Sequence, residues 1–163
     1  MEPSFSLPLG LTKPQQYEYF LSDYRLFIEG ESDAIAILSN TSAALREAFG
    51  FFWVGFYLVK SAEWLSLGPF QGSVACARIK RGRGVCGTAW EKGHTLVVPD
   101  VNVFPGHIAC SSLSRSEIVV PMVDRAGVIR GVLDIDSDRL SAFDEVDRHW
   151  LERIVDVLCQ QIY

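Results

Sequence analysis

The sequence has little positive charge. Its 15 lysines and arginines are outnumbered by 20 aspartates and glutamates, which gives a formal net charge of −5 at pH 7. A nucleic-acid-binding surface needs clustered basic residues, and so does a polybasic membrane contact. We therefore expect neither nucleic acid nor a membrane as a partner, and expect a small or cationic ligand.

The sequence also lacks a hydrophobic run long enough to span a bilayer. Its most apolar stretch, residues 49–59, contains two glycines and is shorter than the ~20 residues of a membrane helix. The amino-terminal segment carries Glu2, two prolines and no basic cluster, unlike a secretory or organellar targeting peptide. These features predict a cytoplasmic protein.

Cysteine is scarce, and its positions exclude two common uses. Cys76, Cys86, Cys110 and Cys159 are too few and too widely spaced for a disulfide scaffold. None of them forms a CxxC or CxxxH pair of the kind that binds zinc, so we expect no metal site. In a reducing compartment these cysteines should be either buried or reactive.

The composition indicates one folded domain. The 163 residues match the usual allowance of ~150 per domain, and a 48% hydrophobic content with 12% aromatic residues supplies a core. We divide the chain into a lead-in, residues 1–13, and a single domain, residues 14–163.

Helical periodicity marks both ends of this domain. A helix is expected from residue 14 to about 30, because proline suits a first turn and aromatic residues then recur every three or four positions. A second helix should begin at Ser32 as the N-cap and end at Gly50. A last helix should follow a capping box formed by Ser141 and Asp144.

Between these helices the hydrophobic period changes to two. Strands are expected at residues 52–59, 63–67, 95–98, 117–123 and 128–136. A short helix should open within the glycine-rich stretch 82–93, and residues 99–116 should form a long loop, a feature that is often functional. Helices at both ends of a run of antiparallel strands predict an α+β sandwich.

The glycine-rich segment GRGVCG, residues 82–87, has the wrong spacing for a dinucleotide-binding fingerprint and follows no βαβ unit. We therefore exclude nucleotide phosphate binding. Backbone N–H groups at the start of a helix could instead bind a carboxylate or another small anion. A flexible connector is the alternative interpretation.

Two groups of side chains are candidates for chemistry. His107 and Cys110 share a loop, and a Cys–His pair can form a hydrolase or transferase nucleophile, although a structural role would also explain a histidine beside a Pro-Gly turn. Asp134 and Asp136 alternate with apolar residues and so share one strand face, while Glu117 begins another strand. These acids indicate either a solvated strand face or a cationic-ligand site containing a carboxyl of raised pKa.

Six segments together resemble those of one family. They are WVGFY at 53–57, LGPFQG at 67–72, GVCG at 84–87, FPGHIAC at 104–110, SEIVVP at 116–121 and GVLDIDS at 131–137. The sequence resembles the free methionine-(R)-sulfoxide reductases, which are catalytic members of the GAF-domain superfamily, from about residue 14 to residue 158. Generic GAF sensors do not share the three cysteines in these contexts. One departure is that the family often has an acid directly after the Ala-Cys pair, where this chain has Ser111.

The resemblance implies a GAF fold: a six-stranded antiparallel sheet with helices from both chain ends packed on it, a pocket for one free amino acid, and often a homodimer. It also implies roles for three cysteines. Cys110 would be the nucleophile, Cys76 the resolving thiol and Cys86 an accessory redox cysteine. It assigns no role to Cys159.

The resemblance further implies a substrate pocket lined by Trp53, Tyr57, Glu117, Asp134 and Asp136. A neutral carboxylic acid near the reacting S–O bond, Glu117 or Asp136, would protonate the departing oxygen. The remaining carboxylates would pair with the substrate ammonium, a group that peptide-bound methionine sulfoxide lacks.

The function implied in this way is reduction of free L-methionine (R)-sulfoxide to methionine, through a sulfenic acid at Cys110 and a Cys76–Cys110 disulfide that thioredoxin reduces. No bound cofactor is expected. One alternative is a non-catalytic GAF module that binds a small ligand, with its cysteines as small core residues. The other is a cysteine hydrolase using His107 and Cys110. The reductase is preferred because a sensor does not need three cysteines near one loop cluster, and a hydrolase gains nothing from Cys76.

Overall fold

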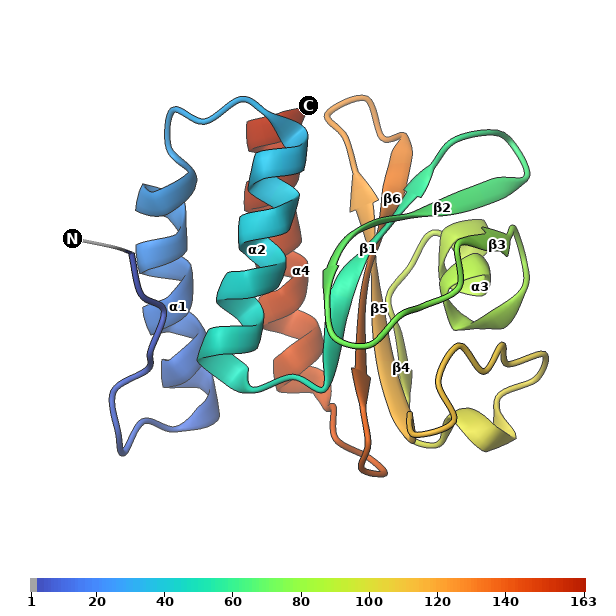
Figure 1. Ribbon diagram of the computed structural model, residues 1–163. Helices are drawn as coiled ribbons and strands as arrows, with labels where there is room; N and C mark the ends of the chain where they lie inside the picture. The colour runs from blue at the N-terminus through green and yellow to red at the C-terminus, as the bar shows by residue number, and fades with distance from the viewer. Residues whose placement is uncertain (1–2) are drawn as a thin grey trace.

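The computed structural model describes residues 3–163, so the first two residues of the predicted lead-in lie outside it. Its elements follow the expected order, with helices at both chain ends and strands between them (Figure 1). The helices are α1 (Lys13–Ile28), α2 (Ala34–Phe49), α3 (Gly84–Lys92) and α4 (Glu145–Ile162), with a short 3₁₀ helix, η1 (Val101–Val103). No helix in the described chain has both the length and the apolar character needed to cross a membrane.

Two of the predicted helix caps are wrong. The N-cap of α2 is Asp33 and not Ser32, because the Asp33 carboxylate accepts a hydrogen bond from the Ala36 N–H at 2.8 Å. The cap of α4 is Asp144, whose carboxylate accepts from the first-turn amides. In both cases a carboxylate caps the helix, where its charge also favours the positive end of the helix dipole.

The strands form one antiparallel sheet in the order β3-β2-β1-β6-β5-β4. Their bounds are β1 (Trp53–Val59), β2 (Trp64–Gln71), β3 (Arg78–Lys80), β4 (Leu96–Val98), β5 (Ser116–Val123) and β6 (Ile129–Ser137). This confirms the six-stranded sheet implied by the resemblance. The periodicity did not predict β3, which is only 3 residues long.

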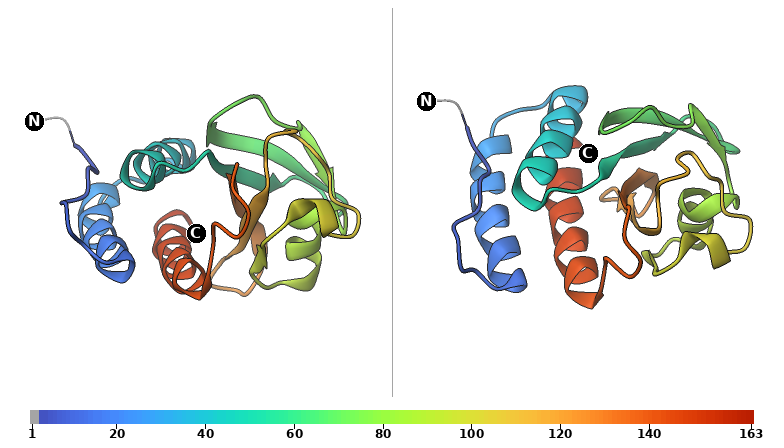
Figure 2. Two further views of the ribbon diagram at one scale, coloured as in Figure 1. Left: turned by 90° about the horizontal axis from the view of Figure 1, so that it is seen from below. Right: turned by 60° about the horizontal axis from the view of Figure 1, so that its bottom comes forward.

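The sheet separates two hydrophobic cores. The first lies between one face of the sheet and the helices α2 and α4, and it extends to α1, which packs on the outer side of these two helices (Figure 2). The second lies on the opposite face, where buried residues of α3 cluster with Tyr57, Val119 and Val132 of the strands. Because strand side chains alternate between faces, β1, β5 and β6 each supply both cores.

The segment before α1 contributes to the first core. Phe5 is buried, and its ring centroid lies 5.3 Å from those of Phe20 and Phe27. Its backbone N–H donates to the Glu47 carboxylate at 3.0 Å. These contacts attach the described part of the lead-in to α1 and α2.

Candidate active site

Strand register brings the three predicted acids to one place. Glu117 of β5 lies opposite Asp136 of β6, and Asp136 also lies opposite Trp53 of β1. Asp134, two residues earlier on β6, projects from the same face and lies opposite Gly55. Like charges directly opposite each other destabilise a sheet, so a pair of this kind points to function and not to stability.

A cavity lies over these acids, on the face of the sheet that carries α3. All five predicted pocket residues line it, and so do two of the predicted cysteines: Trp53, Tyr57, Cys86, Cys110, Glu117, Asp134 and Asp136. The remaining wall comes from the segment after β2, from the start of α3 and from the loop before β5.

The two aromatic residues also hold part of that wall in position. The Trp53 indole Nε1–H donates to the Ser73 carbonyl at 2.9 Å, and the Tyr57 hydroxyl donates to the Cys76 carbonyl at 2.9 Å. The polar groups of both side chains are therefore hydrogen-bonded to backbone carbonyls, and their aromatic rings line the cavity. The segment that carries Cys76 is thus fastened above β1.

A disulfide joins Cys76 to Cys110, with their Cα atoms 5.4 Å apart. Both residues are half-buried, and Cys110 lines the cavity. The loop that contains Cys110 is held against α3 by a hydrogen bond from the Gly84 N–H to the Gly106 carbonyl at 3.1 Å. Because Cys110 is bonded to Cys76, the hydrolase interpretation, which pairs Cys110 with His107, has no free thiol in this state.

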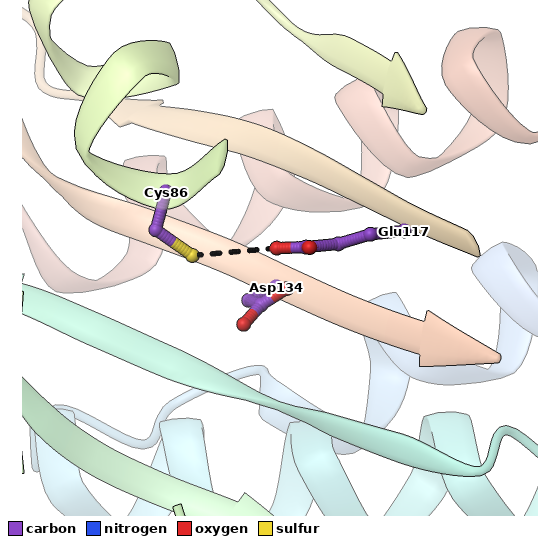
Figure 3. Close-up of side chains that lie close together, drawn as sticks. All are labelled: Cys86, Glu117 and Asp134. Carbon is purple, nitrogen blue, oxygen red and sulfur yellow. Dashed lines mark hydrogen bonds between the residues drawn. The ribbon is translucent and has the colours of Figure 1, made fainter. Parts of the chain in front are cut away.

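Cys86 is a free thiol that lines the same cavity as Cys110. It is buried in the first turn of α3, and its Sγ donates to the Glu117 Oε1 at a distance of 3.8 Å. Figure 3 shows Cys86, Glu117 and Asp134 converging from α3, β5 and β6. The second free cysteine, Cys159, belongs to the other core, on the opposite face of the sheet.

The acids of the site all have raised pKa values. Burial is the main cause for Glu117, and the charges of Asp134 and Asp136 raise its pKa further. Burial raises the pKa of Asp134 to about 6, while the neighbouring Glu117 and Cys86 side chains oppose that rise. Burial followed by the charge of Asp134 raises the pKa of Asp136. Near neutral pH the arrangement favours a proton on Glu117 and a charge on Asp134.

The described residues that line the cavity include no fixed positive charge to balance these acids. Within residues 3–163, no lysine or arginine lines it. The one basic side chain among its described lining residues is His107, and partial burial lowers the pKa of that imidazole. A cationic ligand would therefore find complementary charge here.

The glycine-rich segment leads directly into α3, as expected, but most of its amides are already used. Gly82, Arg83 and Gly84 donate to carbonyls of the protein. The next two amides belong to Val85 and Cys86, which line the cavity at the first turn of the helix. First-turn amides have no acceptor within their own helix, so these two could bind an anionic group of a ligand.

Several lining residues were not singled out from the sequence. Ser73, Ile108 and Ser114 lie in connecting segments near the two disulfide cysteines. Ile108 packs close to Gly84, where an added Cβ would lie 3.2 Å from its side chain. Ile108 belongs to the motif FPGHIAC, residues 104–110, and the only sequence signal for Ser114 is its place in the long loop that was expected to be functional.

Comparison with known proteins identifies the fold family. Residues 33–162 match the model of the GAF domain. This chain belongs to the GAF domain family. It is 56% identical over 147 residues to "GAF domain-containing protein A" of Dictyostelium discoideum, a match that covers 90% of this chain and 92% of that relative.

Other relatives of this GAF domain carry the name that the motifs suggested. The chain is 41% identical over 156 residues to the free methionine-R-sulfoxide reductase of Saccharomyces cerevisiae, covering 91% of this chain and 87% of the relative. A solved structure of free methionine-R-sulfoxide reductase from Neisseria meningitidis, in complex with its substrate, superposes with a TM-score of 0.91 at 50% identity. That match covers 96% of this chain and 95% of the other. The resemblance recognised from the six motifs is confirmed.

Proposed function

We propose that this GAF domain reduces free L-methionine (R)-sulfoxide to L-methionine. The observation that carries the proposal is the Cys76–Cys110 disulfide at a cavity whose floor holds three buried or half-buried acids. Relatives that are named free methionine-R-sulfoxide reductases support the same activity.

The first chemical step needs both a nucleophilic thiolate and a proton donor. In the reduced enzyme the Cys110 thiolate attacks the sulfoxide sulfur, and the oxygen must be protonated before the S–O bond can break. Glu117 is the proposed donor, because burial and neighbouring charges keep its carboxyl protonated. Asp136, directly opposite Glu117 in the sheet, is the second candidate for this role. The oxygen leaves as water and a sulfonium bond forms between the Cys110 sulfur and the substrate sulfur. A water molecule then attacks the Cys110 sulfur and breaks that bond, which releases methionine and a proton and leaves a sulfenic acid on Cys110.

The second step regenerates a stable cysteine pair. The Cys76 thiol attacks the Cys110 sulfenic acid, a disulfide forms and water leaves. In the closed bond the two Cα atoms lie 5.4 Å apart, within the usual range for a disulfide. A dithiol protein of the thioredoxin class then reduces the disulfide, so the reaction needs no resident cofactor. Cys86 is proposed as an accessory redox thiol.

Substrate selectivity follows from charge. The ammonium of a free amino acid would pair with Asp134 and Asp136, and the Trp53 and Tyr57 rings would contact the methylsulfinyl group. A methionine sulfoxide within a peptide lacks that ammonium and would leave the acids unpaired. Binding of the free amino acid is therefore favoured.

The test is methionine release from free L-methionine (R)-sulfoxide in the presence of a dithiol. We expect turnover by the wild type and by Cys159→Ser, whose substitution lies in the other core, and none by Cys110→Ser. Equal rates for Cys110→Ser and wild type would contradict the proposal. Binding of the sulfoxide without reduction would favour the non-catalytic GAF module.

Two further expectations remain predictions. Homodimer formation would be measured by light scattering coupled to gel filtration, and the cytoplasmic location by fractionation of the source cells. The proposed reaction requires neither of them.

A further inference from the structure

The cluster of Cys86, Glu117 and Asp134 matches the geometry of a metal site. One ligand atom from each side chain lies within 4.8 Å of the other two, and all three residues are buried (Figure 3). A tetrahedral zinc ion, with Zn–S of about 2.3 Å and Zn–O of about 2.1 Å, holds sulfur and oxygen ligands about 3.6 Å apart. The Cys86 Sγ lies 3.8 Å from the Glu117 Oε1. We propose that this cluster binds a thiophilic divalent cation of the zinc class, in competition with the amino-acid substrate.

A second observation also points to a cation at this position. The Asp134 Oδ1 is buried and has no hydrogen-bond partner within residues 3–163. The whole residue is 5% exposed. A buried carboxylate oxygen without a partner is destabilising, and a bound cation would supply the missing interaction.

The charge of the site fits a divalent ion. Binding releases the protons of the Cys86 thiol and the Glu117 carboxyl to solvent and leaves a metal-bound thiolate and carboxylate, with no change in oxidation state. One thiolate and two carboxylates then face the ion, and no lysine or arginine of the described residues lines the cavity to repel it. A thiolate ligand selects zinc, cobalt or cadmium over magnesium and calcium, which prefer oxygen.

The ligands come from α3, β5 and β6, so no local spacing in the sequence marks them. Three protein ligands leave a fourth coordination position for water, as in zinc sites that are not purely structural. Because Glu117 and Asp134 are also the proposed substrate contacts, an ion held there blocks the ammonium site and removes the proton donor. The ion would be an inhibitor and not a cofactor.

The cluster is complete while the disulfide is closed, because Cys86 takes no part in the Cys76–Cys110 bond. Binding can therefore be measured on the oxidised protein without a dithiol, which would itself chelate the metal. In this state the free thiols are Cys86 and Cys159, in different cores.

The experiment titrates oxidised, chelator-treated protein with Co²⁺ and follows the thiolate-to-cobalt charge-transfer absorption in the near ultraviolet. We expect one ion per chain, loss of the band in Cys86→Ala and its retention in the matched control Cys159→Ala. Glu117→Gln and Asp134→Asn should keep a thiolate but raise the Kd for Co²⁺ by at least ~10-fold. Magnesium at the same concentration should not displace the cobalt.

Absence of the band in the wild type, its survival in Cys86→Ala, or its loss in Cys159→Ala would each overturn the assignment. An unchanged Kd in both acid variants would do the same, and these variants keep the test valid if Cys86→Ala fails to fold. The competition arm rests on the proposed function: excess free L-methionine (R)-sulfoxide should raise the apparent Kd. Cobalt binding without reductase turnover would refute the proposed function alone, whereas turnover without cobalt binding would refute the metal site alone.

Discussion

Replacing Asp134 with asparagine should stabilise the folded protein at neutral pH. Burial is the main cause that raises the pKa of Asp134 from 3.8 to about 6. One pKa unit corresponds to about 1.4 kcal/mol, so the difference amounts to a destabilisation on the order of 3 kcal/mol when the group is ionised. The asparagine side chain would have nearly the same shape as the aspartate and no charge to bury.

The sign of the pH dependence follows from proton binding. As the pH rises above about 4, the unfolded chain releases the Asp134 proton, whereas the folded chain keeps it until about pH 6. The free energy of unfolding of the wild type should therefore fall between about pH 4 and about pH 6. Above that range the Asp134 carboxyl should cause no further change. The variant and the wild type should be equally stable below pH 4 and differ most above pH 6.

The assay is urea unfolding of the oxidised proteins, followed by far-ultraviolet circular dichroism between pH 4 and pH 8 in the presence of a metal chelator. Asp138→Asn is the matched control, because Asp138 is an exposed acid just after β6. The control should follow the wild-type profile. An Asp134→Asn variant that is no more stable than the wild type at pH 7, or whose difference from it does not change with pH, would refute the reasoning.

Three further predictions concern catalysis and packing. Glu117→Gln should lower turnover by ~10²–10⁴-fold, the usual contribution of general acid catalysis, and a rate within twofold of the wild type would exclude Glu117 as the proton donor. N-acetylation of the substrate removes the ammonium, so kcat/KM should fall sharply, and efficient reduction would contradict the acidic binding site. Gly72→Ala should destabilise the fold by ~1–3 kcal/mol and raise KM, because Gly72 has a φ of +137° and its Cβ would lie 2.5 Å from the Trp53 ring. Urea unfolding and steady-state kinetics would measure both effects, and unchanged stability would contradict the close contact.

Which side chains share a strand face was predictable from the sequence, because successive side chains of a strand point to opposite faces of the sheet whichever strands lie beside it. The pattern around Asp134 and Asp136 correctly put both on one strand face. Which strands lie side by side was not predictable in the same way. The pairing of Glu117 with Asp136 depends on the register between β5 and β6, which packing of the whole sheet decides.

The pairing of the cysteines was likewise not predictable from their positions in the sequence. Their positions exclude a disulfide scaffold, but connectivity cannot be worked out from spacing alone, so the Cys76–Cys110 pair came from the family resemblance. The structure joins those two residues and leaves Cys86 as a free thiol. The short strand β3 was missed because three residues carry too little periodicity, and two caps were misassigned because adjacent or nearby polar residues compete for each helix start.

The most direct test of the account is a single turnover of the reduced enzyme, followed by peptide mapping of its cysteines. One equivalent of free L-methionine (R)-sulfoxide should yield about one methionine per chain, with Cys76–Cys110 as the major disulfide. In Cys76→Ser, the same first turnover should proceed, and multiple turnovers with thioredoxin should be lost. A Cys86–Cys110 bridge as the major product would reverse the roles of Cys76 and Cys86, and methionine release without any disulfide would contradict the mechanism.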